Sequence, residues 1–405
     1  DPHVSGNGVS NTVTNAMYES LVTFDADSNI VPMLAKEWTM SEDGKSYTFI
    51  LNEGITFHDG EPFNAEAVIA NWERGKADES LRVYSQTKSW VSAVADSEYQ
   101  LTITLDEPNN TFLNKLTQVR IISPKAIKEL GKDGLAKQSA GTGPYIAVDC
   151  QSDDHLTLVK NEDYWGGDVK VDNVIVKSFS DGSALTAALQ TGDVQGTYGL
   201  QYDNYALFDG NPDYTINSCA TSRCFFGQFN MESELMQDQN VRKAIEMGID
   251  KEGFCSVIMQ ERGVPAVGAF PGSFSYGNDA VKAPSYDPEE AKKLLEESGW
   301  KDTDGDGYVD KDGKKLSITW LTYPTRLEQP KLAEYAQSTL KDIGIEVNVN
   351  NTADHATYAK NGEFDVYVSS LTTAPTGDPE YFFTSTVVSD VAKNYGKYSN
   401  AALDD

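Results

Sequence analysis

The sequence has little positive charge and no long apolar run. Its 405 residues include 33 lysines and arginines against 62 acidic residues, which gives a formal net charge of -29. Nucleic acids are recognised through a basic surface, so this balance argues against a nucleic-acid-binding protein. No apolar stretch approaches the roughly 18 residues that a membrane span needs, and no basic segment followed by an apolar one opens the chain. The excess of acid is most simply a source of solubility.

Histidine is also scarce, which limits the catalytic chemistry that the chain can offer. The four histidines are His3, His58, His155 and His355, and none pairs with another at metal-ligand spacing. No His-Glu-x-x-His motif and no Gly-x-Ser-x-Gly motif occurs. Glycoside hydrolysis needs only two carboxylates, however, and the chain has 62 acidic residues. A secreted acidic hydrolase is therefore the alternative to a protein without catalytic residues.

Only four cysteines are present, and they allow three full pairings. Cys219 and Cys224 are close enough in sequence for a small-loop disulfide in an oxidising compartment. Buried free thiols at these positions and at Cys150 and Cys255 are an equally good interpretation. Without a second cysteine pair or nearby histidines, the spacing is weak evidence for a metal.

The rest of the composition indicates a folded protein of more than one lobe. With 405 residues, 39% of them hydrophobic and 10% aromatic, the chain is too long for one simple core and can fill two or three. The clearest ordered stretch is residues 45–74. It predicts a strand over 47–51, a short strand over 55–57 and a helix capped by Asn64. Apolar residues recur on one face of that helix, at Ala65, Val68, Ile69 and Trp72.

Other segments of the first half predict a mixture of helices and strands. A helix is expected over residues 13–21. A strand over 171–179 followed by a helix over 183–190 and the residues 193–196 suggests a βαβ-like unit.

The second half predicts an α/β lobe. Asp287 and Pro288 have the residue types of a helix N-cap and first helical position. A strand over 316–323, a helix over 330–343 and a strand over 345–349 follow, and a further strand is expected over 364–369. This alternation favours a largely parallel sheet.

Several words in the sequence resemble one protein family. They are YESLV (18–22), the run 31–38, SEDGKSYTF (41–49), FHDGEPFNAEAV (57–68) and GTGPY (141–145). Together and in this order they resemble the extracytoplasmic solute-binding proteins of peptide and nickel ABC importers. The resemblance implies an α/β, two-lobed, periplasmic-binding-protein-like (type II) fold with an extra inserted α+β subdomain. Its expected parts are lobe I (1–17 and 139–226), the subdomain (18–138) and lobe II (227–405).

The resemblance also implies a function. A monomeric, non-catalytic receptor would capture a small solute between its lobes outside the cytoplasm and deliver it to an ABC permease and its ATPase. No cofactor is required, although nickel could be part of the solute. Relatives usually begin with an earlier strand and continue past residues 398–400, so the chain looks trimmed at both ends. We expect that the C-terminal return to lobe I is absent from this sequence and that a secretion signal and a lipid anchor have been removed from it.

Two arginines are the main candidates for solute binding. Arg120, in the run 119–124, resembles the arginine that nickel-type members direct at the carboxylates of a metal chelate. Arg82 lies near Tyr84, close to where that branch can place a second carboxylate contact. A guanidinium matches a carboxylate with two hydrogen bonds. The alternative for Arg120 is a buried ion pair with one of the many acids.

Peptide-binding members hold the peptide's amino group with an aspartate four residues before the proline of a characteristic word. Here that word is residues 372–382, and counting back from Pro379 gives Pro375, which cannot neutralise an ammonium group. A carboxylate-bearing ligand such as a nickel chelate is therefore slightly favoured over a short peptide. Aromatic side chains that could line the binding site are Trp38, Trp90, Tyr202, Phe226, Tyr358 and Tyr381.

The run 302–310 is the sharpest local metal signal. Oxygen-bearing positions at Asp302, Asp304, Asp306, the carbonyl of Tyr308 and Asp310 match the spacing of a calcium loop. The twelfth position is Gly313 instead of a bidentate glutamate, so this is not a complete EF-hand. A structural calcium ion is one interpretation and a polar turn is the other, since Asp-Gly repeats also form turns.

Overall fold

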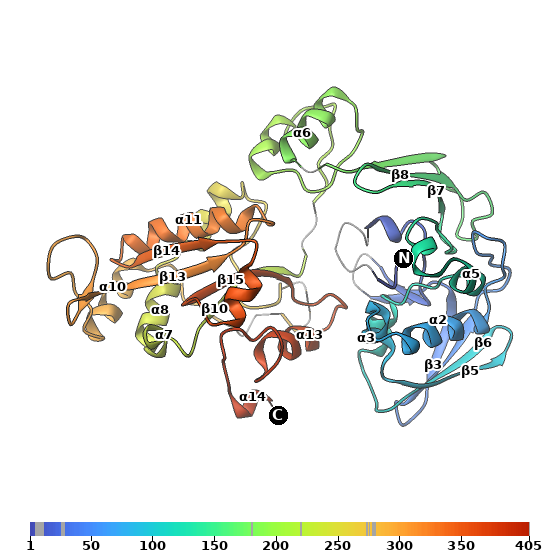
Figure 1. The fold of residues 1–405 in the computed structure, drawn as a ribbon, viewed down its shortest axis with the longest axis horizontal. Helices are drawn as coiled ribbons and strands as arrows, with labels where there is room; N and C mark the ends of the chain where they lie inside the picture. The colour runs from blue at the N-terminus through green and yellow to red at the C-terminus, as the bar shows by residue number, and fades with distance from the viewer. Residues whose placement is uncertain are drawn as a thin grey trace. The chain divides into compact units, whose positions relative to one another are not determined.

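The computed structural model describes residues 1–4, 12–25, 29–179, 181–218, 221–272, 274, 276–277 and 281–404. They form two compact units, Asp1–Ala184 and Leu185–Asp405, coloured blue to green and green to red in Figure 1. Residues 185–226, expected in lobe I, fall in the second unit. The finer division into lobe I, an inserted subdomain and lobe II stays a prediction.

The first unit is built from short antiparallel sheets and helices. Its elements are β1 (Val22–Phe24), β2 (Ile30–Pro32), β3 (Ala35–Met40), β4 (Ser46–Leu51), α2 (Ala65–Ala77), α3 (Arg82–Thr87), β5 (Trp90–Ser97), β6 (Gln100–Leu105), α4 (Phe112–Leu116), α5 (Pro124–Leu135), β7 (Tyr145–Gln151), β8 (His155–Lys160) and β9 (Asn173–Lys177).

The larger core of this unit lies between a four-stranded sheet and α2. The strands run in the order β3-β4-β6-β5, all antiparallel, and alternate residues of β4 point into the core. Phe49, Phe63 and Phe112 are fully buried there. The Asn64 side chain accepts a hydrogen bond from the amide of Ala67 at 3.1 Å and so caps α2. The predicted strand over 47–51 and the capped helix after it are confirmed.

The helix expected over residues 13–21 is wrong. Only residues 12–14 are helical, because the carbonyl groups that would continue the helix bond to another segment. The amide of Gly143 donates to the carbonyl of Met17 at 3.0 Å, and that of Tyr145 donates to Ala16 at 3.0 Å. A Cβ on Gly141 would lie 2.1 Å from the carbonyl oxygen of Met17, so this close approach requires glycine.

The second unit has α/β architecture. Its elements are α6 (Gly182–Thr191, which crosses the boundary), the 3₁₀ helix η1 (Tyr202–Leu207), β10 (Arg223–Phe229), α7 (Glu234–Gln237), α8 (Gln239–Met247), α9 (Lys251–Gly253), the π-helix η2 (Phe254–Ile258), α10 (Pro288–Glu297), β11 (Asp310–Lys311), β12 (Lys314–Lys315), β13 (Ser317–Thr322), α11 (Glu328–Lys341), β14 (Glu346–Asn351), α12 (His355–Lys360), β15 (Val366–Thr372), α13 (Glu380–Phe382), the π-helix η3 (Phe383–Val387) and α14 (Ala401–Asp404).

Its main sheet is largely parallel, as predicted. The strand order is β10-β15-β13-β14, with β13 parallel to both neighbours and β10 antiparallel to β15. Residues of α8, α10 and α11 share one apolar core with these strands. The carboxylate of Asp287 accepts from the amide of Glu290 at 2.9 Å, and Pro288 begins α10, which confirms the predicted helix start.

The βαβ-like unit expected over residues 171–196 is wrong. β9 pairs antiparallel with β8, and residues 193–196 after α6 form no strand. Cys150, Cys224 and Cys255 form no disulfide with one another, and the proposed partner Cys219 lies outside the described residues. Among the helices in the described ranges, none has the length and apolar character to cross a membrane.

Candidate anion-binding site

Arg120 lies in the first unit on an irregular segment that several buried groups hold in place. The amide of Ile121 donates to the carbonyl of Glu19 at 2.9 Å. The buried Asn71 side chain bonds both the amide and the carbonyl of Ile122, at 2.9 and 2.7 Å. A ring nitrogen of His3 lies 2.7 Å from the carbonyl oxygen of Arg120. The backbone from the carbonyl group of Arg120 to Ile122 is therefore fixed.

Within the described residues, the guanidinium of Arg120 is held by neutral oxygens only. Its Nη1 donates to Ser20 Oγ at 2.9 Å and to the carbonyl of Thr117. Its Nε and Nη2 donate to Asn15 Oδ1 at 3.2 and 2.6 Å, on the exposed side of the group. No carboxylate among the described residues lies within ion-pair distance of it, so the structure does not support the alternative of a buried salt bridge.

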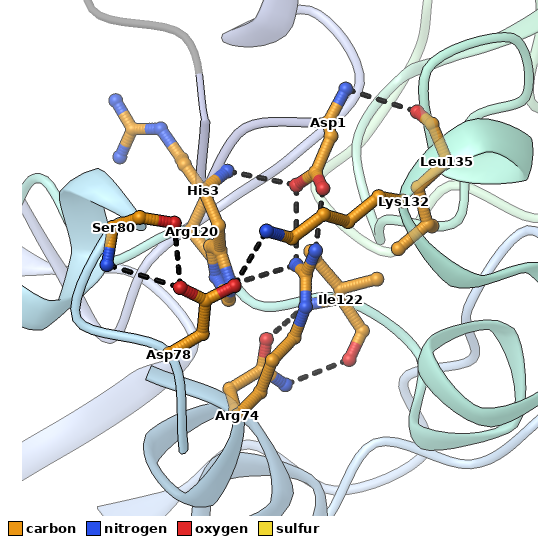
Figure 2. A network of polar contacts seen from close by, with 10 residues as sticks. Asp1, His3, Arg74, Asp78, Ser80, Arg120, Ile122, Lys132 and Leu135 are labelled. Carbon is orange, nitrogen blue, oxygen red and sulfur yellow. Dashed lines mark hydrogen bonds and ion pairs between the residues drawn. The ribbon is translucent and has the colours of Figure 1, made fainter. Parts of the chain in front are cut away.

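A nearby ion-pair network lies on the other side of the Arg120 backbone. Figure 2 shows Arg74 bonded to Asp1 and His3, while the guanidinium of Arg120 points away from these residues. In the same view Asp78 contacts Lys132, with an N–O distance of 2.5 Å. Asp1 and Asp78 of this network are thus paired with Arg74 and Lys132, and among the described contacts neither forms an ion pair with Arg120.

The second predicted arginine lies in the same neighbourhood. Arg82 Nη2 donates to Gln118 Oε1 at 3.2 Å, and Gln118 Nε2 lies 3.2 Å from Thr117 Oγ1, on the residue whose carbonyl binds Arg120. Burial first, and then the charge of Arg82, lower the pKa of Arg120 to about 10, still well above neutral pH. Two guanidinium groups brought together in this way favour an anion.

The neutral groups that orient the two arginines were not predicted from the sequence. Asn15, Ser20, Thr117 and Gln118 have no motif around them that marks a binding residue, although Ser20 lies in the word YESLV. Spacing along the chain gives no signal that residue 15 meets residue 120, because the contact depends on the tertiary fold.

The aromatic candidates of the first unit belong to its core. Trp90 is 3% exposed and packs against Trp72 and Phe112, with ring centroids 6.4 and 5.9 Å away. A side chain so enclosed has little free surface for a solute, which argues against Trp90 as part of the site, and its role in binding stays a prediction. Trp38 is half-buried on β3 and packs against the same core.

The four aromatic candidates of the second unit have partners inside that unit. The Tyr202 hydroxyl donates to Glu328 at 3.1 Å, and Phe226 makes an edge contact with Phe382 at 5.6 Å. Tyr358 is half-buried beside a small core cluster, and the Tyr381 hydroxyl accepts from Lys393 at 2.9 Å. Their role in binding stays a prediction.

The word around Pro375 offers no substitute acid at that position. Pro375 is exposed, and the nearest acid in the word, Asp378, is 6% exposed. Its carboxylate accepts from Thr376 Oγ1 and from the amide of Glu380, the latter at 3.0 Å. Asp378 therefore stabilises its own loop.

The predicted calcium loop is partly assembled. Carboxylate oxygens of Asp302, Asp304 and Asp310 lie within 4.8 Å of one another. Asp306 instead forms an ion pair with Lys315 at 2.6 Å, and this bond is the main cause that lowers the pKa of Asp306. Asp302 also accepts amide hydrogens from Gly305 and Gly307, at 2.7 and 3.1 Å, as expected of a polar turn.

Calcium binding at this loop stays a prediction. Millimolar calcium is expected to raise the melting temperature of the wild type, because the ion would offset repulsion among three clustered carboxylates. Asp302→Asn should abolish the shift, whereas Asp312→Asn, an exposed acid outside the cluster, should keep it. An equal shift in the wild type and Asp302→Asn, or none in either, would show that the loop is only a turn.

The sequence and the structure are similar to those of known proteins of one family. Residues 29–394 match the model of the bacterial extracellular solute-binding proteins, family 5 Middle. The chain is 30% identical over 379 residues to the nickel-binding periplasmic protein of Escherichia coli (strain K12), covering 91% of this chain and 72% of that one. It is 29% identical to the glutathione-binding protein GsiB of Salmonella typhi, covering 86% of this chain and 66% of the relative.

Solved structures agree with this match. NikA from Brucella suis in complex with Fe(III)-EDTA superposes with a TM-score of 0.84 at 27% identity, over 98% of this chain and 81% of that one. DppA from Helicobacter pylori in complex with the peptide STSA superposes with a TM-score of 0.79 at 26% identity, over 100% and 82%. The expected two-lobed α/β fold class is confirmed. Members of this family are non-enzymatic transport components, which argues against the acidic hydrolase. The chain belongs to the bacterial extracellular solute-binding proteins of family 5.

Proposed function

We propose that this protein captures a small carboxylate-bearing solute through Arg120, assisted by Arg82, and delivers it to an ABC permease outside the cytoplasm. The observation that carries the proposal is the guanidinium of Arg120, bonded to neutral oxygens and without a carboxylate among its described partners. A solute carboxylate would supply the missing counter-charge with two parallel hydrogen bonds.

Within this class we favour a metal chelate such as a nickel complex. Pro375 stands where an aspartate would bind the amino terminus of a peptide, and the nearby Asp378 already has partners in its own loop. The E. coli relative is named for binding nickel, and the Brucella structure holds Fe(III)-EDTA. A short peptide or glutathione, as named for other relatives, could use the same arginines through a carboxylate.

Ligand-induced stabilisation tests the proposal. Protein stripped of carried-over solute is expected to melt at a higher temperature with nickel(II)–EDTA or nickel(II)–histidine. A ligand at about 100 times its Kd stabilises the folded state by about 2.7 kcal/mol. Nickel with a polyamine that lacks carboxylates is the matched control and should give no shift. A panel of short peptides and glutathione, each compared with a form in which every carboxylate is an amide, separates the peptide branch.

Each outcome has a defined meaning. A shift with the chelates and none with the polyamine supports the carboxylate chelate. A shift with free-acid peptides alone would overturn the preference for a chelate, but it would still support recognition of the ligand through a carboxylate. Equal shifts with free acids and their amides would overturn the role of the carboxylate.

A further inference from the structure

Close to Arg120 the first unit contains a buried carboxylate that has no cation partner in the described part of the chain. Glu19 is 3% exposed. Its Oε2 accepts from Thr142 Oγ1 at 2.7 Å and from Trp165 Nε1 at 2.8 Å, and its Oε1 accepts from the hydroxyl of Tyr164 at 2.8 Å. These donors are neutral, and no lysine or arginine of the described residues forms an ion pair with it. These hydrogen bonds give the carboxylate oxygens partners but do not neutralise the negative charge of Glu19.

Glu19 and Arg120 are linked through the backbone and through their electric fields. The amide after Arg120 donates to the carbonyl of Glu19, and Ser20, the next residue, accepts from the guanidinium. The charge of Glu19 raises the pKa of Arg120, while the larger effects of burial and Arg82 lower it. The two opposite charges thus interact without direct contact.

Resting on the proposed carboxylate-binding role of Arg120, we propose that Glu19 is a positioning residue that couples capture of the anion to uptake of a proton. An ionised Glu19 partly offsets the charge of Arg120 and repels an incoming carboxylate. A protonated Glu19 has no charge to offset that of Arg120 or to repel the carboxylate, so the site binds the anion more tightly. By linkage, the bound anion must in turn favour protonation of Glu19.

The direction of the pH effect follows from the surroundings of the carboxyl group. Burial raises the pKa of Glu19, and the bonds from Thr142, Trp165 and Tyr164, followed by the charge of Arg120, lower it only in part. The group therefore titrates above the ordinary range of a glutamate. Affinity for the anion should increase as the pH falls through that raised pKa.

The other titratable groups around this site need to be separated from Glu19. His3, which touches the Arg120 carbonyl, has a pKa lowered to about 3 by burial and stays neutral. Burial also raises the pKa of Tyr18 to about 12 and that of Tyr164 further, so both remain neutral. His58 bonds the Gly143 carbonyl at 3.0 Å, and its pKa is lowered by burial. Variants that change Glu19 or its hydrogen bonds are therefore needed to distinguish its titration from that of His58.

The test is calorimetric titration with nickel(II)–EDTA, whose coordinated carboxylates do not titrate in this range. Across a pH series that extends upward from the ordinary range of a glutamate, the wild type should bind about tenfold more tightly at the acidic end than at the alkaline end. Binding should also take up protons, seen as a dependence of the heat on the buffer. Glu19→Gln, which keeps the shape and removes the charge, should bind at all pH values with the low-pH wild-type affinity and without proton uptake.

A second variant keeps the carboxylate. Tyr164→Phe removes one donor to Glu19 and should move the midpoint of the affinity profile up by about one pH unit. It also serves if Glu19→Gln does not fold. An unchanged profile in either folded variant would overturn the coupling while leaving carboxylate capture intact. Absence of binding at every pH, with the whole ligand panel, would overturn the proposed function and this inference with it.

Discussion

Replacement of Arg120 by alanine is expected to weaken binding of a carboxylate-bearing ligand about 100-fold, or about 3 kcal/mol. The guanidinium makes four hydrogen bonds to neutral oxygens and lacks an ion-pair partner among the described residues, so the ligand would supply its main counter-charge. Arg120→Lys should lose most of the same affinity, since an ammonium cannot make two parallel bonds to one carboxylate. Calorimetric titration with nickel(II)–EDTA measures both effects.

Stability distinguishes this result from simple damage to the fold. Arg120 is a half-buried charge without an ion-pair partner among the described residues, so its removal should leave the free energy of unfolding nearly unchanged. Lys137→Ala removes an exposed cation from the same unit and is the matched control for net charge. Equal affinity in the wild type and Arg120→Ala would refute the role of Arg120 in binding. Equal losses of affinity in Arg120→Ala and Lys137→Ala would show that Arg120 acts only through long-range electrostatic attraction.

The arginine was predictable from a word in the sequence, and its surroundings were not. Residues 119–124 resemble a family motif, so the sequence alone marks Arg120 as a candidate. The bonds from Arg120 to Asn15 and Ser20 join segments about 100 residues apart, and only the fold brings them together. The same holds for Glu19, whose donors Thr142 and Trp165 lie 123 and 146 residues away along the chain.

Helix and strand predictions succeeded where the signal was local. A side-chain cap at Asn64 or Asp287 acts within one turn, and both helices begin where these residues predicted. The expected helix over 13–21 failed because its carbonyl groups bond to the amides of Gly143 and Tyr145. Similarly, the sequence shows that residue 90 is an aromatic tryptophan, but it does not show whether this side chain lies in the core or lines a binding site.

A large loss of stability is expected from Arg74→Met in the network of Figure 2. Arg74 forms an ion pair with Asp1 at 2.5 Å, with side chains only 11% and 4% exposed. It also lies 2.9 Å from His3 Nδ1. Removing one partner of such a pair leaves the other charge buried, which costs about 3–5 kcal/mol. Chemical denaturation measures the loss.

The double variant Asp1→Asn with Arg74→Met identifies the cause. It removes both charges, so it should be more stable than Arg74→Met alone, by an amount that a double-mutant cycle isolates. Lys132→Ala breaks the more exposed contact with Asp78 and should have little effect. A loss below about 1 kcal/mol in Arg74→Met would show that water reaches Asp1.

The same network connects stability to binding. His3 is neutral, so the nitrogen facing Arg74 accepts its hydrogen, and the other nitrogen must carry the proton that it donates to the Arg120 carbonyl at 2.7 Å. Without Arg74, the proton of His3 is no longer confined to the nitrogen that faces the Arg120 carbonyl. The hydrogen bond that holds the backbone at Arg120 is then weaker. Arg74→Met should therefore also weaken nickel(II)–EDTA binding under conditions where the variant is fully folded, whereas Lys132→Ala should not.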